Sequence, residues 1–254
     1  MTRHFNLISF VEMENDSLRR IFNTILGTFL AKFSDEIQKK TESIVKASIS
    51  IYNTIRQELL PTPAKSHYTF NLRDLSKVVQ GMLGADVRTV LTDSDVVRLW
   101  SHECMRVFKD RLVDSTDKNW FSNLLKSTMK SELGMLWETI VTTEPLLYGD
   151  YMTPGADPKI YVEIKDMRRL IKLAEEYLED FNSTSRSPMK LVMFLDAIEH
   201  VSRICRIIRQ PAGNALLLGV GGSGRQSLSR LATFMEEYEL FQIEITKSYG
   251  FSEW

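Results

Sequence analysis

The sequence has little of what marks several classes of protein. It has two cysteines in 254 residues, and its 32 basic and 33 acidic side chains leave a formal charge of −1. This balance gives no electrostatic reason to expect nucleic acid or an anionic membrane as a partner. No basic and apolar leader opens the chain, and no apolar run approaches the roughly twenty residues that cross a bilayer. We therefore expect a soluble protein with no nucleic-acid and no membrane partner.

The sequence also shows no metal or catalytic signature. Both cysteines, Cys104 and Cys205, occupy apolar positions of helical patterns, which favours buried free thiols and a reducing, intracellular compartment. The four histidines lack the spacing of metal ligands, and no nucleophile stands beside a paired base. Residues that can form a hydrophobic core are abundant, because 43% of the residues are hydrophobic and 10% are aromatic. The chain is long enough for one large domain or two ordinary ones.

Most of the apolar residues recur at the three-and-four spacing of amphipathic helices. The pattern predicts an all-helical unit over residues 15–134, whose first helix is capped by Asn15 or Asp16. Thr92 and Asp95 have the form of a capping box at the start of a later helix. The five helices expected in this unit cover about 15–33, 35–60, 71–83, 93–108 and 115–133.

Residues 135–164 break the helical pattern, because prolines and glycines cluster there. We interpret them as a linker that ends in a short extended piece, Ile160–Ile164. Beyond it, helices are expected over about 165–182, 189–209 and 225–238, and strands over 215–218 and 241–246; one more strand is expected at 5–11. The predicted fold class is therefore mainly α with small α/β parts. Too few strands are present for the sheet of about five on which a phosphate-binding loop normally sits, so both sheets would be incomplete.

The most informative stretch is a glycine run between an apolar segment and a helix. Free backbone amides and the positive end of a helix dipole bind phosphate at such a junction. Gly219 and Gly224 have the spacing of a nucleoside-triphosphate loop, although Arg225 and Gln226 stand where a lysine and a hydroxyl residue are usual. Together with Gly221, the two glycines also fit a dinucleotide loop, but the acidic residue that such a site needs after the second strand is not clearly present. A glycine-rich turn without a ligand is the third interpretation.

The sequence resembles dynein heavy chains, and their axonemal members most of all. The resemblance covers essentially the whole chain, and it is carried by Thr2–Asn6, Phe70–Leu75, Phe194–His200, Gly213–Leu217, Gly219–Leu228 and Tyr249–Gly250. It implies a segment that joins the third AAA+ module of the motor ring to the fourth. Residues 1–14 would be the last core strand of the third module, 15–134 its helical AAA+ lid, 135–164 a linker, and 165–254 the incomplete N-terminal half of a P-loop AAA+ α/β module.

The resemblance also implies a set of nucleotide-binding residues. Arg73 would be the sensor-two arginine of the third module, Arg3 would belong to an arginine-finger region, and Tyr161 and Val162 would approach adenine. The implied cofactor is ATP or ADP, with or without Mg²⁺. The Walker A segment would consist of Gly219, Val220, Gly221, Gly222, Ser223, Gly224, Arg225, Gln226 and Ser227.

The departures from the family pattern favour a regulatory site that binds nucleotide without splitting it. Gln226 offers magnesium no hydroxyl, and Ser227 lies about 100° further round the helix. The implied partners are the adjacent AAA+ modules and, through the full motor, microtubules and dynein intermediate and light chains. The implied location is the cytoplasm and cytoskeleton, in the axoneme of a cilium or flagellum. Two alternatives stay open, namely a helical scaffold or interaction fragment with a vestigial loop, and a dinucleotide-binding domain.

Overall fold

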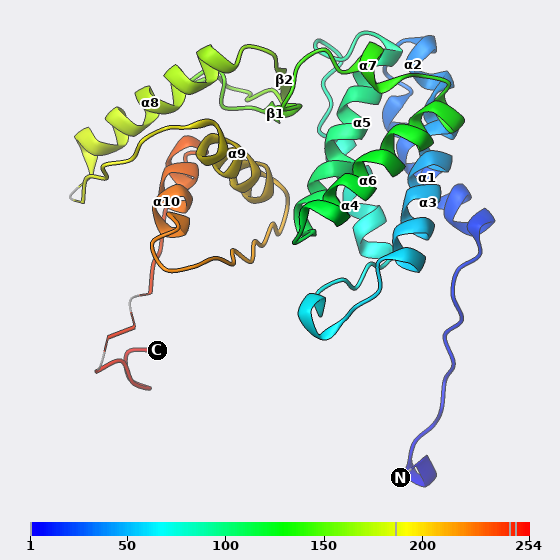
Figure 1. Ribbon diagram of the computed structural model, residues 1–254, viewed down its shortest axis with the longest axis horizontal. Coiled ribbons are helices and arrows are strands. Elements are labelled where there is room, and N and C mark those ends of the chain that lie inside the picture. Colours follow the sequence, from blue (N-terminus) through cyan, green and yellow to red (C-terminus); the bar gives the residue numbers. More distant parts are fainter. Residues whose placement is uncertain (1, 186, 244, 247) are drawn as a thin grey trace. The chain divides into compact units, whose positions relative to one another are not determined.

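The computed structural model describes residues 2–185, 187–243, 245, 246 and 248–254. The chain is mainly helical and divides into two compact units, Met1–Leu146 and Leu147–Trp254 (Figure 1). The predicted fold class, mainly α with a small β part, is confirmed. In the part of the chain that is described, no helix combines the length and the apolar character needed to span a bilayer.

The first unit is built around α3, a helix that is buried on most of its circumference. It spans Thr41–Glu58 and packs against α1, α4, α5 and α6 (Figure 1). A helix with so wide an apolar surface is stable only when other helices cover it. The remaining helices of the unit are α1 (Asn15–Leu30), α2 (Asp35–Lys39), α4 (Leu72–Met82), α5 (Asp93–Val107), α6 (Ser115–Thr128) and α7 (Trp137–Ile140), with the short turns η1 (Thr2–His4), η2 (Pro63–Lys65), η3 (Lys109–Arg111) and the π-helical η4 (Met129–Leu133).

Two polar contacts fix the register of the helices in this core. The indole of Trp100, which is fully buried on α5, donates a hydrogen bond of 2.8 Å to Ser48 Oγ on α3. Asp117 on α6 accepts a bond of 2.7 Å from the Tyr68 hydroxyl. Because a buried donor without an acceptor is costly, each contact allows few alternative positions of its two segments.

The predicted helices of this unit are largely confirmed, with three corrections. The capping box of α5 is present: Asp95 N donates to Thr92 Oγ1 at 3.2 Å, and Thr92 N donates to Asp95 Oδ2 at 2.9 Å. The predicted cap at Asn15 or Asp16 is wrong, because both residues lie inside α1, which starts without a side-chain cap. The helix expected over 35–60 is divided at Lys40, and the one expected over 115–133 is α-helical only to residue 128.

The second unit places a two-stranded hairpin beside three helices. Strands β1 (Leu147–Gly149) and β2 (Val162–Ile164) are antiparallel, with Leu147 opposite Ile164. The helices are α8 (Met167–Thr184), α9 (Leu195–Arg209) and α10 (Arg225–Met235). Their inner faces share one core, which includes Leu170, Leu173, Tyr177, Ile198, Val201, Cys205, Leu228, Leu231 and Ala232. Cys104 and Cys205 are buried free thiols, as predicted.

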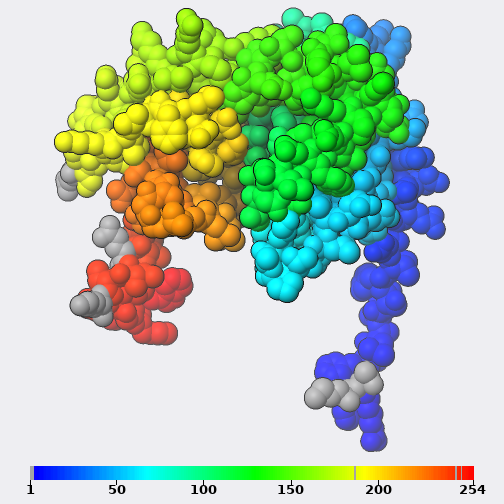
Figure 2. Space-filling model, viewed as in Figure 1, coloured from blue at the N-terminus to red at the C-terminus, as the bar shows by residue number. Residues whose placement is uncertain are grey.

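The predicted strands are mostly wrong. Only the extended piece predicted at 160–164 is confirmed, because it contains β2. The partner strand β1 lies in the segment that was predicted to be an irregular linker. Residues 5–11 form no strand: the chain before α1 extends away from the helices, and Phe10 is 92% exposed (Figures 1 and 2). Residues 215–218, 241–243, 245 and 246 are likewise irregular, while Glu244 lies outside the described residues. A strand needs a neighbour for its backbone hydrogen bonds, and the described residues supply these runs with none.

Two further segments differ from expectation. The helix predicted from Met189 begins at Leu195, because Met189 exchanges backbone bonds with the Asn182 side chain: Met189 N donates to Asn182 Oδ1 at 2.7 Å and Met189 O accepts from Nδ2 at 2.9 Å. The expected linker contains the short helix α7. The one-turn length of α7 leaves too few residues for a helical period to be recognised.

The capping box of α5 gives the first testable prediction. Thr92→Ala removes the acceptor for Asp95 N, so the free energy of unfolding should fall by about 1 kcal/mol in a urea titration. Ser94→Ala is the matched control, because the Ser94 hydroxyl only reaches the neighbouring Asp93 side chain. Equal effects of the two substitutions would show that the box does not stabilise the helix.

Candidate phosphate-binding loop

The glycine run forms a tight turn that leads into α10. Gly222 and Gly224 have φ angles of 79° and 77°, in the left-handed region that glycine enters without steric cost. A Cβ on Gly219 would lie 2.9 Å from Ser223 Oγ, a side-chain atom that can rotate away. Two of the four glycines, Gly222 and Gly224, therefore meet a specific demand of the backbone.

The start of α10 directs free backbone amides out of the helix. Gly224 is the residue before the helix, and Leu228 N is the first amide with an intrahelical acceptor, Gly224 O at 2.8 Å. The amides of Arg225, Gln226 and Ser227 thus have no acceptor within the helix, and no side chain caps it. Together with the positive end of the helix dipole, three such amides form a site for an anion.

The side chain of Arg225 folds back over the loop. Its Nη2 donates a hydrogen bond of 3.2 Å to Val220 O, and its Cδ lies 3.6 Å from the position that a Cβ on Gly219 would occupy. A guanidinium is therefore held beside the anion-binding amides. Gln226 is exposed and Ser227 is half-buried.

Two other predicted site residues, Tyr161 and Val162, lie in or beside the hairpin and not in the glycine loop. Tyr161 is buried, with its ring 5.6 Å from that of Tyr148 and 4.5 Å from the guanidinium carbon of Arg209. Val162 pairs with Gly149 in the hairpin. The position of Tyr161 is therefore set by contacts with Tyr148 and with Arg209 of α9, and that of Val162 by pairing in the hairpin.

The two arginines predicted from the resemblance belong to the first unit. Arg73 is exposed in the first turn of α4, where its backbone amide donates to Asn71 Oδ1 at 2.9 Å. Arg3 is exposed in η1. Their side chains are thus at the surface, and no described contact assigns them a ligand.

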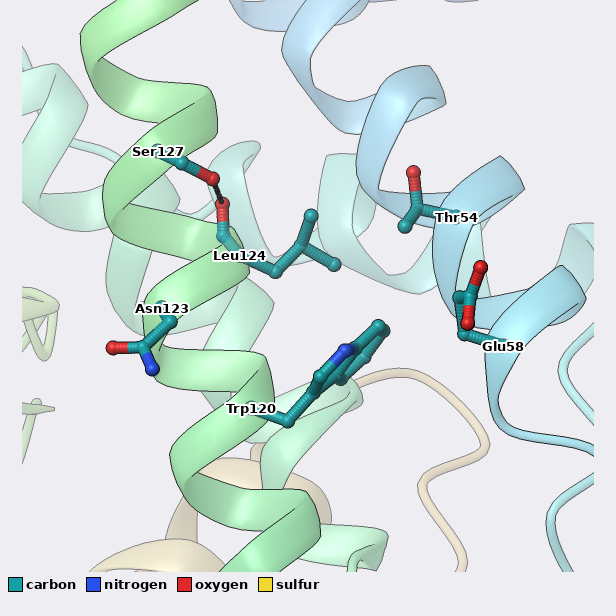
Figure 3. A pocket seen from close by; sticks show the side chains of 6 residues that line it. All are labelled: Thr54, Glu58, Trp120, Asn123, Leu124 and Ser127. Atoms are coloured by element: carbon teal, nitrogen blue, oxygen red, sulfur yellow. Dashed lines mark hydrogen bonds between the residues drawn. The ribbon is translucent and has the colours of Figure 1, made fainter.

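A surface depression lies on the first unit, between α3 and α6. It has a volume of about 520 Å³ and is lined by Thr54, Glu58, Trp120, Asn123, Leu124 and Ser127. Figure 3 shows the Trp120 ring lying across it, between the two helices. None of the six lining residues is a cation, so the depression does not suit a phosphate group. The glycine loop remains the better candidate site.

Comparison with known proteins finds one dynein family match in each of the two units. Residues 21–118 match the family described as dynein heavy chain, ATPase lid domain, and residues 189–254 match the family described as P-loop containing dynein motor region D4. The chain is 51% identical over its whole length to human dynein axonemal heavy chain 1 and 45% identical to mouse dynein axonemal heavy chain 3. The chain belongs to the axonemal dynein heavy-chain family.

The family assignment confirms the resemblance seen in the sequence. The dynein lid match begins within α1 and ends within α6, while the D4 match contains α9, the glycine loop and α10. The chain is therefore part of a dynein motor ring, with a helical lid followed by part of an AAA+ region. It spans about 6% of the length of heavy chains 1 and 3.

The left-handed start of α10 gives the second prediction. Alanine at Gly224 has room for its Cβ, which would lie 3.8 Å from Leu228, but it must adopt φ near 77°. Gly224→Ala should therefore lower the free energy of unfolding by about 1 kcal/mol. Gly221→Ala is the matched control, because Gly221 has open space around it and no left-handed φ. A urea titration in which both variants behave alike would contradict the assigned loop conformation.

Proposed function

We propose that the glycine loop binds the phosphates of ATP or ADP as a regulatory site that hydrolyses ATP weakly or not at all. The observation that carries the proposal is the start of α10, where two left-handed glycines precede three amides without intrahelical acceptors. The P-loop described for the matching dynein D4 family supports the same ligand class. The ligand-binding residues would be Gly219 to Ser227.

Arg225 would supply the positive charge of the site. Its guanidinium already lies over the loop, within reach of Val220 O. A guanidinium can contact two phosphate oxygens at once, whereas the lysine usual at this position acts as a point charge. Arg225 therefore suits phosphate binding but gives a different contact geometry from that of a typical P-loop.

The residues present do not fit a magnesium ion held in the usual way. The hydroxyl that coordinates the ion in a P-loop is replaced by the amide of Gln226, and magnesium demands strict geometry of its oxygen ligands. Among the described residues, no group of three or more histidine, cysteine, aspartate or glutamate side chains could hold a metal ion. We infer that nucleotide binds to this chain by loop amides and Arg225, without dependence on magnesium.

In the whole heavy chain the site would serve a ciliary or flagellar motor. The names of the matching relatives, which are axonemal heavy chains, support a location in the axoneme. The immediate partners would be the neighbouring AAA+ modules of the same polypeptide, and Arg73, Tyr161 and Val162 would belong to nucleotide sites formed with them. Microtubules and the dynein intermediate and light chains would be reached only through the complete motor.

The third prediction concerns binding. Fluorescently labelled ATP and ADP should bind the full 254-residue chain with the same affinity in Mg²⁺ and in EDTA. Arg225→Ala should weaken binding about tenfold, or 1.4 kcal/mol, because a charge-assisted phosphate contact is lost. Arg168→Ala, an exposed arginine of α8, is the control. Tighter binding of NAD than of ATP would favour a dinucleotide site, and no binding of any of these ligands would favour a vestigial loop.

The fourth prediction concerns turnover. The chain should release no phosphate from ATP above background, because no residue in the loop is placed to activate water or to hold a magnesium ion. Phosphate release is measured with and without Mg²⁺ in the native chain and in Gly224→Val. Magnesium-dependent turnover that disappears in Gly224→Val would overturn the non-hydrolysing role.

A further inference from the structure

The depression between α3 and α6 is lined by two rows of side chains, one from each helix. The row on α3 is Thr54 and Glu58, one turn apart, and the row on α6 follows the three-and-four spacing of a helix face, with Trp120, Asn123, Leu124 and Ser127. All six residues are half-buried or exposed. In Figure 3 the side chains of Thr54, Leu124 and Trp120 are directed into the space between the helices.

Trp120 offers the depression an aromatic surface that the rest of the described chain does not use. Its half-buried indole has no hydrogen bond, cation or second ring against it among the described residues. The other two tryptophans of the first unit are engaged: Trp100 donates to Ser48 Oγ at 2.8 Å, and Lys126 Nζ lies 5.7 Å from the ring centre of Trp137. Tryptophan is the side chain that attracts cations best, and it is enriched where partners bind.

Glu58 gives the depression a negative charge. It is the last residue of α3, where free carbonyl groups already form the negative end of the helix dipole, so a cation is favoured there. In the part of the chain that is described, the exposed Glu58 carboxylate has no ion pair. Arg56, the basic residue of the same turn, lies about 200° round the helix and is bonded to Glu12 at 3.0 and 3.1 Å.

A guanidinium group matches both features of the depression. Its flat face stacks on an indole, while its N–H groups can donate to the Glu58 carboxylate and to the side-chain oxygen of Asn123. An ammonium group would bring the charge without the stacking face. The apolar stem of an arginine side chain would lie against Leu124 and the methyl group of Thr54.

We propose that the depression between α3 and α6 is a docking pocket for an arginine side chain presented by a partner protein, stacked on Trp120 and paired with Glu58. Charge complementarity selects this occupant, because the pocket carries a carboxylate and none of its lining residues is a cation. Apolar residues beside the arginine of the partner would contact Leu124. All lining residues belong to the first unit, so this role does not depend on nucleotide binding by the glycine loop.

The fifth prediction tests the pocket with a capped leucine–arginine–leucine peptide and the full chain. The peptide should shift the indole N–H signal of Trp120 in the NMR spectrum, where Trp120→Phe identifies that signal among the four tryptophans. The same peptide with neutral citrulline in place of arginine should leave the signal unchanged. Glu58→Gln should weaken binding about threefold, because an exposed ion pair is lost. Glu42→Gln, which removes an exposed carboxylate from the first turn of α3, is the matched control and should bind like the native chain.

The aromatic contact is tested by fluorescence anisotropy of the labelled peptide. Trp120→Leu should weaken binding about tenfold, and Trp120→Phe, which keeps a ring, should weaken it less. Circular dichroism checks that each variant is folded. Equal binding of the arginine and citrulline peptides, or native affinity in Glu58→Gln, would overturn the pocket. Capped arginine alone, if it competed as well as the whole peptide, would overturn docking of a protein segment.

Discussion

Backbone amides and carbonyls that leave water need partners, and this requirement shapes both units of the chain. Helices satisfy it within their own segment, and most of the described elements are helices. The hairpin satisfies it with a single ladder between β1 and β2. Elsewhere side chains complete the pairing, as when the Asn182 amide serves both backbone groups of Met189.

The same requirement explains why the glycine loop is the candidate site. The first amides of α10 are left without acceptors because Gly224 offers no side chain to cap them. At α5 the corresponding amide is satisfied by Thr92, and at α8 it is satisfied by Asp166. Helices α1 and α9 also start without a side-chain cap, so what marks the start of α10 as an anion site is the pair of left-handed glycines before it and the guanidinium beside its amides.

Local features of the sequence predicted the helices, the capping box of α5 and the loop, because each depends on residues within one or two turns of each other. The strand at 5–11 could not be judged in this way, since a pleated run forms a strand only when another strand lies beside it. The hydrogen bond between Arg209 and Asp150 joins residues far apart in the chain and follows no spacing rule. The break at Lys40 was missed because the apolar period of 35–60 continues across it.

In the glycine loop, the carbonyl oxygen of Val220 competes with a bound phosphate for a hydrogen bond from Arg225. A phosphate that uses the same Nη2 hydrogen must displace Val220 O, so for this mode of binding the observed affinity equals the intrinsic affinity multiplied by the fraction of molecules in which that hydrogen is free. Any change that weakens or strengthens this internal bond would alter nucleotide affinity without touching the nucleotide. A neighbouring module that shifts the loop carbonyl could thus adjust occupancy of the site while every phosphate contact stays the same.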